Sequence, residues 1–249
     1  MTFNREPVLR GVMTDFIFFF LFLMTKLSKK YTEASKLIDR KKMYSIAEAA
    51  ELVTKVSYTK FVWSVDIAIK TFANPKYNDQ AIRATTSLPH GNGKTVKVAV
   101  FTTEDNVATA KSAGADIAGF GDLIQKIEKG EMEFDILVTT PDLMKDLAKV
   151  AKILWPKGIM PNPKSGTVTT DLPSTIAEIK KGRFEFKLDK TGNIHALMGK
   201  VSFTPAQLAD NITAFIAAVN ANKPTGIKWK LIKKIVIAPT MGPGIVISN

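Results

Sequence analysis

The central part of the chain alternates short apolar runs with segments in which apolar residues recur every three or four positions. Lys97–Thr102 and Asp135–Thr139 are compact apolar runs that predict buried strands, and Ala115–Ala118 is a shorter one. Asn106–Ala113 and Asp122–Lys129 predict helices, each followed at once by a glycine. Strands and helices that alternate in this way predict a parallel, doubly wound, Rossmann-like sheet.

The segments on either side of this region predict three further helices. Ser45 and Glu48 stand three residues apart, which is the spacing of a capping box, and apolar residues follow at helical spacing. Thr204 and Pro205 predict the start of a second helix, because threonine caps helices and proline is favoured at the first helical position. Pro173–Lys181 predicts the third, which ends at a glycine.

The same outer segments also predict strands. Val65–Thr71 and Lys234–Ala238 are rich in β-branched residues, and the second of them is expected to be the last strand. Phe184–Leu188 alternates apolar and charged residues, which is typical of a half-buried strand. A turn follows, and Ile194–Met198 is expected to return as the second arm of a hairpin. The outer parts are therefore predicted to be α+β.

Two clusters of proline and glycine divide the chain. Between them the charge changes: residues 24–90 carry a net +6, residues 91–157 a net −1, and residues 158–249 a net +7. We therefore predict one discontinuous domain (residues 24–90 and 158–249) with an inserted α/β domain (residues 91–157), preceded by an N-terminal extension (residues 1–23). The clusters are the candidate hinge, with Pro89, Gly91 and Gly93 in the first and Gly158, Pro161 and Pro163 in the second.

The net charge of +12, with a pI of about 9.7, indicates a polyanionic partner, of which nucleic acid is the commonest. The chain has no cysteine, which excludes disulfides, zinc-thiolate sites and cysteine nucleophiles. It has only two histidines, His90 and His195, which is too few for a histidine-built metal centre. We predict no metal and no cofactor.

The N-terminal extension contains nine consecutive apolar residues, Phe16–Met24. A membrane-spanning helix needs about 20 such residues, so no membrane partner is expected. Three interpretations stay open for this segment: an upstream extension without a folding role, a targeting or anchoring element, and a buried segment.

An enzyme is the alternative to a nucleic-acid-binding protein. Gly91–Thr95 (GNGKT) ends like a phosphate-binding loop, but Leu88 stands where that loop needs its first glycine, and the loop precedes its strand. No hydrolase nucleophile motif or zinc-protease motif is present. A nucleotide-binding enzyme on the inserted domain is therefore disfavoured, and we predict no catalytic residue.

Several residues are candidates for RNA contacts, each with a structural alternative. Phe61 beside Lys60 suits stacking on a base next to a phosphate, or else Phe61 is a core residue. Ser64 and Asp66 share one face of a strand, where Asp66 can accept from a guanine edge or a ribose hydroxyl or simply be solvated. The loop Thr240–Gly244 is either an RNA contact, with glycine allowing close approach of a sugar, or an ordinary turn.

Six stretches carry a resemblance to a known family. They are SIAEAAELV at 45–53, TKFVWSVDIAI at 59–69, DQAIRATTSLPHGNGK at 79–94, KGIMPNPKSGTV at 157–168, FEFKLDKTGNIHALMGKVSF at 184–203 and PTMGPGI at 239–245. Together they resemble the ribosomal protein L-one family of the large-subunit stalk, from about Met24 to Asn249. MPNPK…GTV together with TMGP is the most specific part of the match.

The resemblance implies two domains joined by a hinge, and a protein that is part of the large ribosomal subunit. Family members bind a folded junction in large-subunit ribosomal RNA, assist the release of deacylated tRNA from the exit site, and in bacteria repress their own mRNA. Carried onto this sequence, it implies RNA contacts at Lys60, Phe61, Ser64, Asp66, His195, Lys200, Lys234, Thr240, Met241 and Gly242.

Two local features bear on this resemblance. Trp155 stands before Pro156 where the family usually has glycine, which is a bulky change near the second cluster. The segment at residues 74–80 resembles the cyanobacterial and plastid branch. Together with the excess of lysine over arginine, it predicts the plastid (chloroplast) ribosome as the location, with the bacterial cytoplasm as the alternative.

Overall fold

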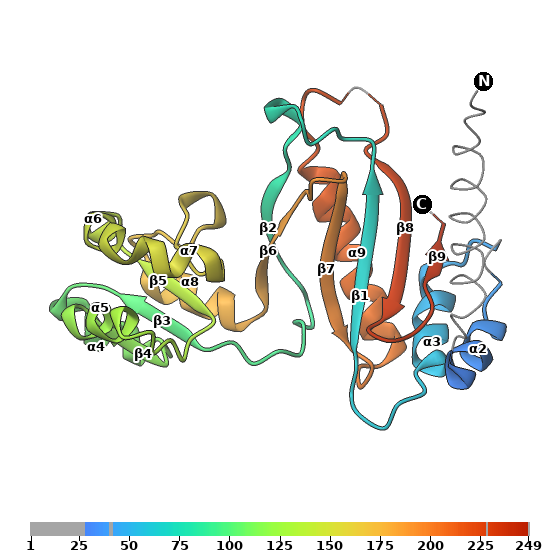
Figure 1. Ribbon diagram of the computed structural model, residues 1–249, viewed down its shortest axis with the longest axis horizontal. Coiled ribbons are helices and arrows are strands. Elements are labelled where there is room, and N and C mark those ends of the chain that lie inside the picture. The colour runs from blue at the N-terminus through green and yellow to red at the C-terminus, as the bar shows by residue number, and fades with distance from the viewer. Residues whose placement is uncertain (1–27, 40–41, 228, 249) are drawn as a thin grey trace, which may run out of the picture.

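The computed structural model describes residues 28–39, 42–227 and 229–248, which fold into two lobes (Figure 1). The larger lobe comprises the described residues between 28 and 88 and between 183 and 248, and the smaller lobe comprises residues 98–180. The apolar segment Phe16–Met24 lies outside the described residues. Among those that are described, no helix is both long enough and apolar enough to span a bilayer.

The larger lobe is built from both ends of the chain. Its elements are the helices α2 (Lys29–Lys36), α3 (Ile46–Val56) and α9 (Pro205–Ala221), the 3₁₀ turn η1 (Asn78–Gln80), and the strands β1 (Ser64–Thr71), β2 (Arg83–Ser87), β6 (Arg183–Lys187), β7 (Asn193–Lys200), β8 (Ile232–Pro239) and β9 (Ile245–Ile247).

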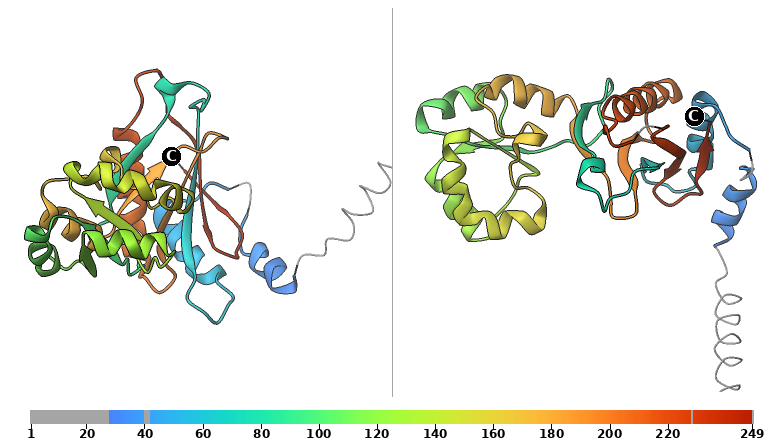
Figure 2. Two further views of the ribbon diagram at one scale, coloured as in Figure 1. Left: turned by 60° about the vertical axis from the view of Figure 1, so that its left-hand side comes forward. Right: turned by 90° about the horizontal axis from the view of Figure 1, so that it is seen from above.

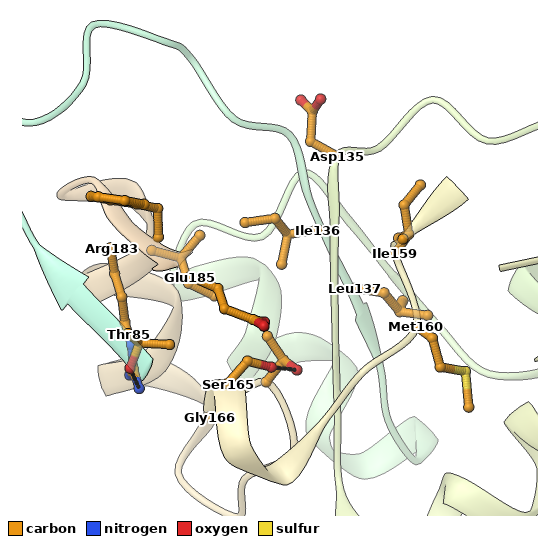
Figure 3. Close-up of a pocket in the computed structure, with 14 residues that line it drawn as sticks. Thr85, Asp135, Ile136, Leu137, Ile159, Met160, Ser165, Gly166, Arg183 and Glu185 are labelled. Atoms are coloured by element: carbon orange, nitrogen blue, oxygen red, sulfur yellow. Dashed lines mark hydrogen bonds between the residues drawn. The ribbon is translucent and has the colours of Figure 1, made fainter. Parts of the chain in front are cut away.

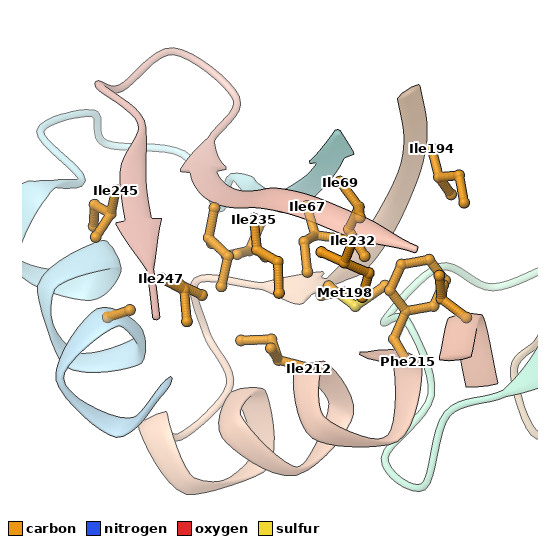
Figure 4. Packing of buried hydrophobic residues seen from close by; sticks show 14 of the residues in the cluster. Ile67, Ile69, Ile194, Met198, Ile212, Phe215, Ile232, Ile235, Ile245 and Ile247 are labelled. Carbon is orange, nitrogen blue, oxygen red and sulfur yellow. The ribbon is translucent and has the colours of Figure 1, made fainter. Parts of the chain in front are cut away.

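Four antiparallel strands in the order β7-β1-β8-β9 form the main sheet of this lobe. Helices α3 and α9 cover one face of it. Both begin with capping boxes; the sequence predicted the one at Ser45, whereas at Thr204 it predicted the cap but not the reciprocal contact from Gln207. Ile67 and Ile235 point from the sheet toward Ile212 and Phe215 of α9, and all four side chains are fully buried (Figure 4). The opposite face of the sheet carries the alternate residues of each strand.

The sequence predicted a hairpin between residues 184–188 and 194–198. Its turn is present, but the two strands do not pair with each other as predicted. The turn forms, since the Asp189 N–H donates to the Asn193 carbonyl at 2.8 Å. However, β6 pairs with β2 in a two-stranded ribbon, and β7 pairs along β1. Each strand thus finds its partner far away in the sequence, which a local pattern does not specify.

The strand at residues 234–238 is not the last one. The chain turns at Thr240–Gly244 and returns as β9, which pairs antiparallel with β8 so that Val246 lies opposite Val236. With three residues, β9 is too short to give a recognisable alternation of apolar and polar positions.

The smaller lobe follows the predicted alternation of strands and helices. Its elements are the strands β3 (Val98–Phe101), β4 (Ile117–Gly119) and β5 (Ile136–Thr139), the helices α4 (Glu104–Ser112), α5 (Gly121–Glu128), α6 (Met144–Leu147), α7 (Ala151–Lys157) and α8 (Leu172–Lys180), and the 3₁₀ turns η2 (Pro141–Leu143), η3 (Ala148–Val150) and η4 (Pro163–Ser165).

The sheet of the smaller lobe is parallel, with the order β4-β3-β5. Val98 and Val100 of β3 pack against α4 and α8 on one face, whereas Ala99 and Phe101 pack against α5, α6 and α7 on the other. Helices on both faces of a parallel sheet are the doubly wound arrangement, so the predicted fold class is confirmed.

The chain crosses from one lobe to the other twice. Packing places the second crossing later in the chain than residue 158, where the sequence predicted it. Leu172, Ile176 and Ile179 of α8 are buried against β3, although residues from 158 onward were assigned to the discontinuous domain. The helix starts after the second proline–glycine cluster, so that cluster marks a loop within the smaller lobe. The chain leaves this lobe at Gly182 instead.

The two crossings lie against each other. A Cβ added to Gly182 would stand 2.7 Å from the Cα of Gly91, so the backbones touch. Asn211 of α9, which is fully buried, fixes the first crossing to the larger lobe: its amide donates to the Gly91 carbonyl at 2.9 Å and its Oδ1 accepts from the His90 N–H at 3.1 Å. The sequence pattern gave no sign of this role for Asn211.

Candidate nucleic-acid interface

One face of the four-stranded sheet carries half of the ten candidate RNA-binding residues, and the other five lie in loops beside it. Along β1 the residues Val65, Ile67 and Ile69 enter the core, so Asp66 and Lys70 point the other way and are exposed. Strand register places His195 of β7 opposite Ala68 and places Lys234 of β8 opposite Lys70. Figure 2 shows α9 on the other side of this sheet, so the face is open among the described residues.

Asp66 and His195 interact on this open face. Partial desolvation by the sheet raises the pKa of the Asp66 carboxyl, and the nearby His195 acts in the opposite direction. His195 also lies beside Asp189, with 3.5 Å between Nε2 and Oδ2. His195 therefore lies close to two carboxylates, those of Asp66 and Asp189.

The turn before β7 holds Asp189 in its ionised form. The Asn193 N–H donates to Asp189 Oδ1 at 2.7 Å, and the N–H and hydroxyl of Thr191 donate to it at 2.9 and 2.8 Å. These hydrogen bonds, the one from Asn193 first, lower the pKa of Asp189 to about 2.

The loop Thr240–Gly244 is anchored to the start of β1 and to Tyr58, two residues after the end of α3. The N–H and the hydroxyl of Thr240 both donate to the Ser64 carbonyl at 3.1 Å. The Tyr58 hydroxyl donates to the Met241 carbonyl at 2.9 Å, and the Gly242 N–H donates to Pro239 at 2.9 Å. The loop thus has a fixed conformation, while the Met241 side chain remains 59% exposed.

Gly242 is required by the packing of the loop itself. A Cβ at this position would overlap the ring of Pro239 and approach Val56 Cγ1 to 3.6 Å. The sequence interpretation gave a different reason, namely close approach of an RNA sugar, and the structure supplies one that needs no ligand. Tyr58 also supports this loop, through its hydrogen bond to the Met241 carbonyl, and the sequence pattern did not predict this role.

Lys60 and Phe61 lie in the loop between α3 and β1, and both are exposed. Phe61 is 63% exposed, which removes the alternative that it is a core residue. Its ring rests on Trp63, with 5.7 Å between centroids, and Trp63 in turn packs edge-on against Tyr58. Trp63 is therefore the buried base of an aromatic stack whose outer ring, Phe61, faces solvent.

Most of the candidate residues gather at one end of the sheet. Lys200 lies opposite Ser64, and Ser64 holds Thr240, so these three adjoin the Phe61 loop. Asp66 and His195 follow toward the middle of the sheet, and Lys234 lies farther along, opposite Lys70. The six residue steps from Ser64 to Lys70 span about 20 Å. The structure thus brings the predicted residues onto one continuous surface.

The six candidate hinge residues form two groups, and only the first group lies at a crossing between the lobes. Pro89, Gly91 and Gly93 lie at the first crossing, and Gly93 is packed against Phe203. Gly158 ends α7 with a left-handed conformation, while Pro161 and Pro163 belong to the loop that carries η4. This second group lies beside the β2–β6 ribbon and not at a crossing.

A small cavity of about 160 Å³ separates the η4 loop from the β2–β6 ribbon (Figure 3). Arg183 closes one end of it: its guanidinium donates to Thr85 Oγ1 at 3.2 Å and to Glu178 Oε2 at 2.6 Å. The same guanidinium lies over Gly166, where any Cβ would collide with it. Arg183 therefore joins the ribbon of the larger lobe to α8 and the η4 loop.

The part of the chain that the structure describes contains neither a phosphate-binding loop nor a cluster of metal ligands. The loop Gly91–Thr95 leads into β3 and not into a helix N-terminus, so it lacks the surroundings of a phosphate-binding loop. Among the described residues, no group of three or more histidine, cysteine, aspartate or glutamate side chains could hold a metal ion.

The chain matches the model of one known protein family over most of its length. The model of the ribosomal protein L1p/L10e family matches residues 53–243, which include strands β1, β7 and β8 of the main sheet, the smaller lobe and the loop from Thr240 to Pro243. The chain belongs to this family. The resemblance predicted from the sequence motifs is therefore confirmed.

Individual relatives cover nearly the whole chain. It is similar to the large ribosomal subunit protein uL1 of Kosmotoga olearia, with 48% identity over 222 residues, which is 89% of this chain and 96% of the relative. The uL1 proteins of Chlorobaculum tepidum and Thermosipho melanesiensis are also 48% identical over 89% of this chain and 96% of their own lengths.

Proposed function

We propose that this L1-family protein is a constituent of the large ribosomal subunit and binds a folded junction of its ribosomal RNA. The observation that carries the proposal is the distribution of charge. With the second crossing at Gly182, residues 91–182 carry equal numbers of basic and acidic residues, so the net +12 resides in the parts of the chain that build the larger lobe. A polyanion is therefore attracted to one lobe.

The proposed contact surface is the open sheet face with its adjoining loops. Lysines neutralise phosphates there, while Phe61 offers a ring for stacking and the fixed Thr240 loop offers main-chain groups. The proposed contacts are Lys60, Phe61, Ser64, Asp66, His195, Lys200, Lys234, Thr240, Met241 and Gly242. Because phosphate contacts release counterions, the logarithm of affinity should fall by about 0.7–0.9 per contacted phosphate for each tenfold rise in salt.

The smaller lobe has a different proposed task. Since it is nearly neutral, it should add little to the affinity for ribosomal RNA. We propose that it moves about the crossings at Pro89–Gly93 and Gly182 as part of the mobile stalk and assists the release of deacylated tRNA from the exit site. Repression of the protein's own mRNA, by a site that mimics the ribosomal one, is a further proposal.

The ribosome in question is proposed to be of the bacterial type. The relatives named above are bacterial proteins, which supports the bacterial cytoplasm. The plastid ribosome stays a prediction that rests on the segment at residues 74–80.

The direct test is crosslinking in cells followed by sequencing of the attached RNA, together with sedimentation of the tagged chain on a sucrose gradient. We expect the crosslinks to concentrate in one junction of the large-subunit ribosomal RNA, and the chain to sediment with the large subunit. Crosslinks spread over unrelated RNAs, with the chain at the top of the gradient, would refute the proposal.

Thr240→Val tests the proposed surface in particular. Loss of the hydroxyl removes one of the two hydrogen bonds from Thr240 to the Ser64 carbonyl, and we expect affinity for large-subunit ribosomal RNA to fall by about 1–3 kcal/mol. Thr213→Val is the matched control, since the exposed Thr213 hydroxyl also donates to a backbone carbonyl, that of Ala209 at 2.8 Å, but from α9. Equal affinities for the two variants, measured by filter binding, would remove Thr240 from the interface.

A further inference from the structure

A second group of exposed aromatic rings lies at the opposite end of the larger lobe from the Thr240 loop. Trp229 is 84% exposed and Phe72 is 57% exposed, and both line an open groove with Ile227 and Lys230. Figure 1 shows this region at the top of the larger lobe, where the loop between α9 and β8 meets the segment that follows β1. We call it the aromatic–lysine groove.

Lysines stand beside these rings. Lys233 Nζ lies 5.6 Å from the centre of the Phe72 ring, and Lys230 lines the groove next to Trp229. No described carboxylate lies within ion-pair distance of either ammonium group. One acidic side chain is close to the floor of the groove: Asp79, whose Oδ2 would lie 2.6 Å from a Cβ on Gly226. The local balance of these groups is therefore positive.

Of the ten proposed contacts for ribosomal RNA, only Lys234, the neighbour of Lys233, lies at this end of the sheet. Thr71 pairs with Ile232 at this end of the sheet, whereas Thr240 binds Ser64 at the other end. The length of β8, from Ile232 to Pro239, puts about 23 Å between the two places. None of the ten proposed contact residues lines the groove.

Exposed aromatic rings next to lysines without a carboxylate partner suit single-stranded nucleic acid. Every nucleobase has a face that stacks on an aromatic side chain, and the flanking phosphates seek cations, which is how sequence-tolerant binding of single strands works. A protein partner with an apolar surface would be favoured by the rings but would leave the two ammonium groups without counter-charges. A second copy of this basic chain would add like charge to the same place.

We propose that the aromatic–lysine groove binds a single-stranded segment of RNA. One base stacks on Trp229 and a neighbouring base lies over Phe72, while Lys230 and Lys233 contact the phosphates on either side. This site adjoins the surface proposed for the folded junction only at Lys234 and does not depend on it. It gives the larger lobe a second RNA contact, at the other end of the sheet.

Fluorescence anisotropy of the full chain with fluorescein-labelled decauridylate tests the proposal. Trp229→Ala should weaken binding about 5- to 150-fold, which is the effect of removing one stacking ring. The double variant Lys230→Gln and Lys233→Gln should also weaken it and should reduce the slope of log Kd against log salt by about 0.7 for each lost contact. These side chains are exposed, so far-ultraviolet circular dichroism should match that of the unaltered chain.

Two controls separate this site from the rest of the molecule. Trp155→Ala removes a ring of similar exposure, 79%, from the smaller lobe, and it should leave decauridylate binding within twofold. Thr240→Val should also leave it within twofold, so that failure of the proposed junction surface and failure of this groove give different results.

Three outcomes would overturn the proposal. The first is a Trp229→Ala variant that binds decauridylate as the unaltered chain does. The second is an equal loss on Trp155→Ala, which would show that any exposed ring suffices. The third is a dimer in analytical ultracentrifugation that Trp229→Ala abolishes without a change in decauridylate binding, which would assign the groove to self-association.

Discussion

The Asp189 carboxylate gathers hydrogen bonds from three groups within four residues of its own position. Its pKa of about 2 lies below the ordinary value of 3.8, so the ionised form is favoured by folding. This contribution is complete above about pH 4, where the unfolded chain is also ionised, and it is lost as the pH falls through 2.

Asp189→Asn should therefore lower the free energy of unfolding by about 1 kcal/mol at pH 7, after allowance for the screening of a partly exposed group. The difference between the variant and the unaltered chain should shrink between pH 4 and pH 2, because the carboxylate becomes protonated in both states. Urea unfolding at pH 7, 4 and 3 measures it. Glu131→Gln, which changes an exposed carboxylate in a turn of the smaller lobe, should give a small difference at pH 7.

At the scale of single residues, the sequence predicted which side chains suit RNA contacts better than it predicted which side chains hold the loops in place. Phe61 was recognised as a candidate for stacking because aromatic and lysine residues stand side by side, and the structure confirms that its ring is exposed. Tyr58 and Asn211 were missed, since each bonds to backbone more than 100 positions away. Such contacts exist only once the fold has formed, so no local spacing announces them.

At the scale of elements, the predicted helix caps and the periodicity of apolar residues were reliable, and the predicted strand partners were not. The helices α3 and α9 begin where the sequence placed them, because a cap acts within a single turn. The hairpin of β6 and β7 was wrong, and β9 was not foreseen. Pairing depends on which strands lie adjacent in space, and a three-residue strand carries too little pattern to be recognised.

Because the two crossings lie against each other, a side chain at Gly182 should destabilise the protein. Its φ of +101° is unfavourable for any side chain, and its Cβ would stand 2.7 Å from the backbone of Gly91. Gly182→Ala should therefore lower the free energy of unfolding by about 1–3 kcal/mol and push the two crossings apart.

Gly121→Ala is the matched control, because no heavy atom lies within 4 Å of the added Cβ and the residue begins α5. It should be neutral or slightly stabilising, since alanine is the better helix former. Urea unfolding of both variants measures the difference. Equal stabilities would show that the crossings have room to separate at no cost.

At the scale of the whole molecule, the charge partition and the packing agree once α8 is assigned to the smaller lobe. The sequence placed the second boundary at residue 158 because prolines and glycines cluster there. Buried contacts of Leu172, Ile176 and Ile179 with β3 move it to Gly182. A proline–glycine cluster marks a break in regular structure, and only packing tells whether the chain leaves its lobe at that break.

Two deletions test where the larger lobe ends. Replacing residues 92–181 with a short glycine–serine linker should give a folded protein, because Gly91 and Gly182 already touch and the linker has almost no distance to span. It should bind large-subunit ribosomal RNA within about tenfold, or 1.4 kcal/mol, of the full chain, since the removed lobe is nearly neutral.

Replacing only residues 91–157 should behave differently, because it leaves α8 without the sheet that covers its apolar side. Leu172, Ile176 and Ile179, all buried in the full chain, would then face water, and an exposed patch of this kind promotes aggregation. We expect this variant to unfold at a lower urea concentration and to elute early in size-exclusion chromatography, while the longer deletion remains monomeric. If the shorter deletion were the better-behaved protein, the boundary at Gly182 would be wrong. If both fold but lose RNA affinity by several orders of magnitude, the smaller lobe carries much of the binding and the division of labour proposed for the two lobes fails.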